Sequence, residues 1–149
     1  MRKKNNVADY AIAAFRYWAR KGYPSYDEAA NKIYNQALAK STDKDPKTAI
    51  TYAEAEVERA SAALSDILAC ETVFREFEST GNSIVCDAVR EIYMIQPQKK
   101  LNHSIIRSRV LAFAVKTPMS EAQVYRYLAK ARDAFAMVRN LRNDDSEDE

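Results

Sequence analysis

The stretch SIIRSRVLAFAVK (residues 104–116), followed by TPM and then by SEAQVYRYLAKARDAFAMVRNL (residues 120–141), decides the fold. Apolar residues recur at helical spacing in both segments, and the threonine–proline step between them predicts a turn. Ser120 and Gln123 have the spacing of a capping box, which predicts that the second helix begins at this serine. A helix of roughly ten residues, a tight turn and a second amphipathic helix form a helix-turn-helix pattern.

The second helix has two different faces. At 100° per residue, one stripe within about 40° of a single line is apolar and faces the core. This stripe consists of Val124, Leu128, Ala131, Phe135 and Val138. Arg126 lies about 200° around the helix from Val124, with small alanines and Lys130 beside it. Because small side chains allow close approach to bases and arginine bonds a guanine edge bidentately, this layout predicts binding to duplex DNA.

Several side chains around this helix have the chemistry needed to contact DNA. Gln123 is suited to adenine or to a phosphate, and the amides that follow Ser120 are suited to the backbone. Basic residues of the preceding helix and turn are expected to hold neighbouring phosphates. The predicted DNA-binding residues are Arg107, Arg109, Lys116, Ser120, Gln123, Tyr125, Arg126 and Lys130.

The same residues resemble a known family. The runs IIRSRVLAFAVKTPM and SEAQVYRYLAKARDAFA are similar to the fourth-region helix-turn-helix of sigma-70-type factors, especially the small phage and prophage regulators of the ArpU and RinA type. The matching positions are Ser120, Val124, Tyr125, Arg126, Ala131 and Arg132, within a resemblance that covers about residues 84–142. Since a promoter-melting region has no counterpart here, the resemblance implies a transcriptional regulator that binds duplex DNA. Whether such a regulator also contacts RNA polymerase is left open by the sequence.

The rest of the chain also has a helical pattern, which predicts an all-α protein. Residues 1–81 form a helical N-terminal region, residues 82–142 the helix-turn-helix domain, and residues 143–149 an acidic tail expected to be disordered. The predicted helices before the decisive stretch are Val7 to about Arg20, Tyr26 to about Lys40, Lys47 to about Ser79, and Ser83 to about Ile95.

The central prediction, Lys47 to about Ser79, is either one long helix or two with a soft joint. Its apolar residues follow a seven-residue repeat, which the charged residue Glu71 interrupts. Such a stripe is suited to packing against the chain's own helices or to pairing in a homodimer.

Composition excludes several classes of function. The chain has 2 glycines, 1 histidine and 2 cysteines, too few for a phosphate-cradling glycine loop, a metal site or a histidine-based triad. We therefore expect no enzyme activity, no cofactor and no metal. No apolar run reaches the roughly 18 residues of a membrane helix, and MRKKNNVADY lacks the apolar core of a secretion signal. Together with cysteines that have the pattern of reduced thiols, this predicts a cytoplasmic protein without a membrane partner.

The net charge of +2 conceals an uneven distribution. Residues 96–143 hold 10 basic and 2 acidic side chains, a surplus suited to a polyanion such as DNA, although a solvated helical surface has the same composition. Two alternatives to the regulator stay open. A small terminase subunit also joins a helix-turn-helix to oligomerisation helices, and a helical adaptor would use the basic surface to bind an acidic protein.

Overall fold

The computed structural model describes residues 6–41 and 45–142. Within these ranges the chain is helical and contains no strand, which confirms the all-α prediction. The elements are α1 (Asn6–Arg20), α2 (Tyr26–Lys40), α3 (Pro46–Arg59), α4 (Ser61–Ser79), α5 (Ser83–Val89), the π-helical turn η1 (Arg90–Met94), α6 (His103–Lys116) and α7 (Glu121–Arg139). The acidic tail predicted at residues 143–149 lies outside the described residues.

Side-chain caps determine where α2 and α3 begin. The Oγ of Ser25 accepts a hydrogen bond from the amide of Glu28, and the Glu28 carboxylate accepts one from the amide of Ser25. This reciprocal capping box starts α2 where the sequence predicts it. Asp45 caps α3, and Pro46 occupies its first position, where a missing amide proton costs nothing.

The central helix is two helices joined at Ala60. The backbone of Ala60 leaves the helical region there (φ −91°, ψ 12°), so that α3 ends and α4 begins within one residue. Glu71, the fault in the apolar repeat, has a partner in the structure, because its carboxylate accepts a hydrogen bond from the amide of Tyr26 at the start of α2. The acidic residue therefore ties α4 to α2.

One hydrophobic core joins the beginning of the chain to its end. It contains buried side chains from α1, α4, α5, η1, α6 and α7. Aromatic rings form its centre: Phe15 of α1 lies 6.0 Å from Phe74 of α4 and 5.6 Å from Phe135 of α7, between ring centroids. The core thus draws on residues from both 1–81 and 82–142.

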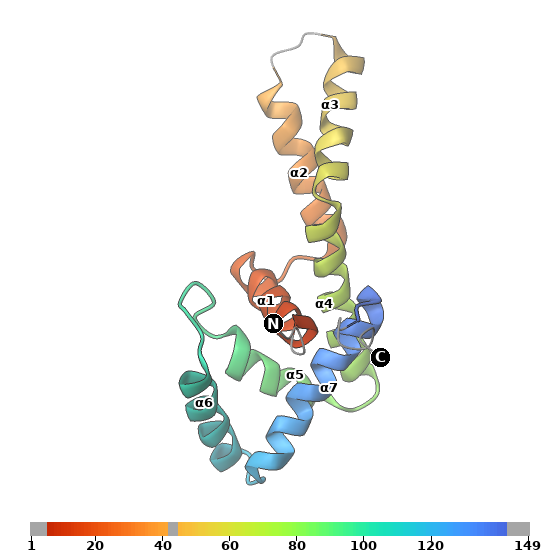
Figure 1. The fold of residues 1–149 in the computed structure, drawn as a ribbon. Helices are drawn as coiled ribbons and strands as arrows, with labels where there is room; N and C mark the ends of the chain where they lie inside the picture. Colours follow the sequence, from red (N-terminus) through yellow and green to blue (C-terminus); the bar gives the residue numbers. More distant parts are fainter. Residues whose placement is uncertain (1–5, 42–44, 143–149) are drawn as a thin grey trace, which may run out of the picture.

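Helices α2 and α3 form a hairpin that projects away from this core (Figure 1). Its only fully buried side chains, among the part of the hairpin that the structure describes, are Ala37 and Ala53. Ile50 and Tyr52 of α3 are more than two-fifths exposed. The hairpin therefore carries apolar surface that stays exposed among the residues that the structure describes.

The segment predicted as one short helix from Ser83 to Ile95 has two parts. After α5 the chain widens into the π-helical turn η1, whose residues Ile92, Tyr93 and Met94 are buried. No helix in the described ranges combines the length and the apolar character needed to span a bilayer.

Candidate nucleic-acid interface

Hydrogen bonds fix the connection between α6 and α7. Thr117 Oγ1 donates to the carbonyl of Phe113 at 2.6 Å, which closes the end of α6. Ser120 is extended and its Oγ accepts from the amide of Gln123 at 3.1 Å, so α7 begins with the predicted cap. The Gln123 side chain does not complete the capping box, because its Oε1 accepts from Nη2 of Arg126 at 2.5 Å.

The apolar stripe of α7 lies against the core, as predicted, over four of its five positions. Val124, Leu128, Ala131 and Phe135 are fully buried. The prediction is wrong for Val138, which is 47% exposed. Val138 is the last residue but one of α7, and its angle around the helix differs from that of the line by no more than the angle of the buried Leu128, so its exposure reflects its place at the helix end.

The opposite side of α7 is open to solvent and carries what we call the α7 basic face: Gln123, Tyr125, Arg126 and Lys130. Arg126 and Lys130 are exposed and lie one turn apart. Tyr125 is 41% exposed, while Gln123 is half-buried and holds the Arg126 guanidinium. The structure therefore exposes Arg126 and Lys130 at the centre of this face, with Gln123 and Tyr125 on its two flanks.

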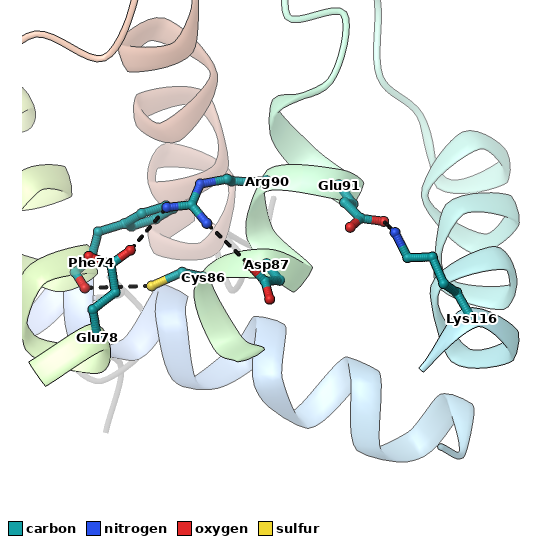
Figure 2. Close-up of polar contacts among 7 residues, drawn as sticks. All are labelled: Phe74, Glu78, Cys86, Asp87, Arg90, Glu91 and Lys116. Carbon is teal, nitrogen blue, oxygen red and sulfur yellow. Dashed lines mark hydrogen bonds and ion pairs between the residues drawn. The ribbon is translucent and has the colours of Figure 1, made fainter. Parts of the chain in front are cut away.

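The three basic residues predicted on α6 have different surroundings. Arg107 is exposed. Arg109 is half-buried, and its Nη1 donates to the carbonyl of Ile92 at 2.8 Å, which fastens α6 to η1. Lys116 pairs with Glu91 at 2.5 Å (Figure 2). Arg109 is thus engaged in holding the fold, whereas Arg107 presents its charge to solvent.

A hydrogen bond to a buried tyrosine positions the middle of α7. Tyr93 of η1 is 2% exposed, and its hydroxyl accepts from Nη1 of Arg132 at 2.9 Å. Burial raises the pKa of this hydroxyl, although the neighbouring Arg132 opposes the shift. Arg132 therefore orients α7 on η1.

Figure 2 shows how α5 and the first residue of η1 are tied to α4. Arg90 pairs with Glu78 at 3.1 Å and with Asp87 at 3.2 Å, and its guanidinium lies 5.0 Å from the centre of the Phe74 ring. The Cys86 thiol donates to the carbonyl of Phe74 at 3.6 Å. These contacts hold in place the helices on which α7 rests.

One buried arginine is not among the predicted site residues. Arg16 of α1 is 8% exposed, and its Nη1 donates to the carbonyl of Tyr93 at 2.5 Å. Its Nη2 donates to three carbonyls of the loop that follows η1, those of Gln96, Pro97 and Lys99. Its position, about 100° around the helix from Phe15 and outside the apolar stripe of α1, gave no signal of this burial.

Within the described ranges, no group of three or more histidine, cysteine or acidic side chains is placed to hold a metal ion. Comparisons of the chain with known protein families, curated proteins and solved structures gave no match.

Proposed function

We propose that α6, the turn and α7 form a helix-turn-helix that binds duplex DNA, and that the chain is a sequence-specific transcriptional regulator of phage or prophage type. The observation that carries this proposal is the division of α7 into a fully buried apolar stripe and an exposed basic face. A helix in the major groove needs both, because one side anchors it and the other reaches the bases.

Each residue of the α7 basic face has a role in this proposal. Arg126 reads a guanine edge, and its bond to Gln123 fixes the direction of the guanidinium before DNA arrives. Lys130 and Arg107 neutralise phosphate charges. Tyr125 and the backbone amides that follow Ser120 donate hydrogen bonds to phosphate oxygens. Arg109 contributes by positioning α6. Lys116 can bind a DNA phosphate only by giving up its ion pair with Glu91.

A salt titration of binding tests the proposal. Fluorescence anisotropy with a labelled random duplex would compare the wild type with Arg126→Ala/Lys130→Ala. A matched control, Lys32→Ala/Lys40→Ala, removes the same charge from exposed positions of α2. We expect salt-dependent binding whose slope, log K against log salt, falls by about 1 in the α7 variant only, because Lys130 is the phosphate contact that this variant removes. Absence of binding at low salt by the folded wild type, or equal slopes in both variants, would overturn the proposal.

The base-reading role of Arg126 requires a separate measurement. Selection of bound sequences from a random library should give a motif for the wild type and a motif relaxed at about one base pair for Arg126→Ala. An unchanged motif would contradict the role given to this side chain.

A second candidate is an assembly function, either as a small terminase subunit or as a protein adaptor. The projecting α2–α3 hairpin favours it, because Ile50 and Tyr52 are exposed there. Sedimentation velocity distinguishes the candidates: a ring-sized oligomer supports the terminase subunit, and a monomer or dimer that binds DNA supports the regulator. A folded protein that binds an acidic protein but no DNA supports the adaptor.

A further inference from the structure

A groove of about 680 Å³ lies between α1, the loop after η1 and the start of α6. Its basic lining side chains are Arg16, Arg20, Lys99, Lys100 and His103. The single acidic side chain among the lining residues is Asp9. The volume is in the range of ordinary ligand pockets, which makes the composition of the lining informative.

The arginines of this groove donate their hydrogen bonds to uncharged backbone carbonyls, so their positive charges are not neutralised by these partners. Arg16 donates to four backbone carbonyls, and Arg20 Nη1 donates to the carbonyl of Pro97 at 3.1 Å. No ion pair between described residues joins either arginine to a carboxylate. Burial lowers the pKa of Arg16, and the charges of Arg109 and Arg20 lower it further, as expected where positive charge is in excess.

The groove is separate from the α7 basic face. It lies at the first turn of α6, beside His103, whereas α7 begins beyond the last residue of the same helix. A helix of 14 residues is about 21 Å long. The first turn of α6 also directs the positive end of its helix dipole toward the groove.

We propose that this α1–α6 groove binds a phosphate group. Arg20, Lys99 and Lys100 donate to the phosphate oxygens, and the apolar side chains of Ile12 and Leu101 contact the body of the ligand. The phosphate comes either from a small phosphorylated ligand or from the DNA backbone, since both present the same oxygens. The proposal rests on the cavity and its charges and holds whether or not α7 binds DNA.

Isothermal titration calorimetry with inorganic pyrophosphate at constant ionic strength tests it. We expect saturable binding of one pyrophosphate per chain, weakened about tenfold or more by Lys99→Ala/Lys100→Ala. The Lys32→Ala/Lys40→Ala control and Arg126→Ala/Lys130→Ala should bind as the wild type does, with circular dichroism confirming that each variant is folded. No saturable binding by the wild type, or equal affinities in the groove variant and the control, would overturn the proposal.

A second measurement identifies the source of the phosphate. If the groove takes the DNA backbone, saturating pyrophosphate weakens duplex binding and Lys99→Ala/Lys100→Ala lowers its salt slope by about 1–2. If it takes a small ligand, duplex affinity is the same in the groove variant and in the charge-matched control. Loss of duplex binding by Arg126→Ala/Lys130→Ala with intact pyrophosphate binding would show that the two sites are independent.

Discussion

Arg139, the last residue of α7, donates from Nε to Oδ1 of Asp66 on α4 across 2.7 Å. The hydroxyl of Tyr10 on α1 bonds to the Asp66 carboxylate at 3.0 Å and accepts from Nη2 of Arg139 at 3.2 Å. Three helices from the start, middle and end of the chain therefore meet in one polar cluster. The bond to Asp66 also raises the pKa of Arg139.

Replacing Asp66 by asparagine should lower the free energy of unfolding by about 1–3 kcal/mol, because the Arg139 guanidinium loses its counter-charge where only 23% of its side chain is exposed. Urea denaturation followed by circular dichroism measures the change. Glu78→Gln is the control, since its pair with Arg90 is exposed and contributes less than about 1 kcal/mol. Equal losses in the two variants would show that the cluster has no special role.

Neighbouring arginines of α6 should separate stability from binding. Arg109→Ala leaves the carbonyl of Ile92 without its donor and should destabilise the fold by about 1–3 kcal/mol. Arg107→Ala should change stability by less than about 0.5 kcal/mol and lower the salt slope of duplex binding by about 1. The opposite pattern, with Arg107 affecting stability and Arg109 affecting only binding, would contradict this assignment.

The two ends of the α7 stripe should respond differently to truncation. Phe135→Ala removes a fully buried ring in contact with α1 and should lower the free energy of unfolding by about 3–5 kcal/mol. Val138→Ala, at a half-exposed position, should cost less than about 0.5 kcal/mol. Thermal melts of both variants check this, and a similar loss for Val138→Ala would mean that its side chain is covered in solution.

Alkaline pH should destabilise the protein through its two thiols. Burial raises the pKa of Cys86 to about 11 and raises that of Cys70 as well. In the unfolded chain both thiols ionise at about pH 8.5. Their contribution to the free energy of unfolding is therefore fully present below that pH, and it is lost as the pH rises toward the pKa values of the folded protein. Between pH 8 and pH 10 we expect a loss of about 2–4 kcal/mol.

The double variant Cys70→Ala/Cys86→Ala is the control for this pH dependence. It should be less stable at pH 8, since two buried side chains are shortened, but its stability should fall less steeply with pH. Urea denaturation at several pH values gives both quantities. Identical slopes in the variant and the wild type would rule out the thiols as the cause.

The parts of the fold that depend on local bonds could be read from the sequence. The capping box of Ser25 and Glu28 and the Asp45–Pro46 start involve residues at most three apart, and both are present. The buried stripe of α7 was also predictable over four positions, because helical spacing alone determines it. The contact of Arg126 with Gln123 is one further local feature, within reach of the i, i+3 rule.

The π-helical turn η1 could not be predicted in this way. The carbonyls of Ile92 and Tyr93 find their donors in Arg109 and Arg16, which lie 17 and 77 residues away in sequence. Because these arginines satisfy the carbonyls, the segment does not need to end as a regular α-helix. The same long-range bonds shape the α1–α6 groove, so the groove too is a product of tertiary structure.

The contact between Phe15 and Phe135 has a consequence for how the chain folds as it is synthesised. The two rings, 5.6 Å apart, are separated by 120 residues of sequence, so α1 leaves the ribosome long before its partner exists. Until α7 emerges, the sides of α1 and α4 that contact Phe135 and its neighbours on α7 stay uncovered, which leaves apolar surface open to association. Closure of this large loop makes folding slower than is usual for a helical protein of this size.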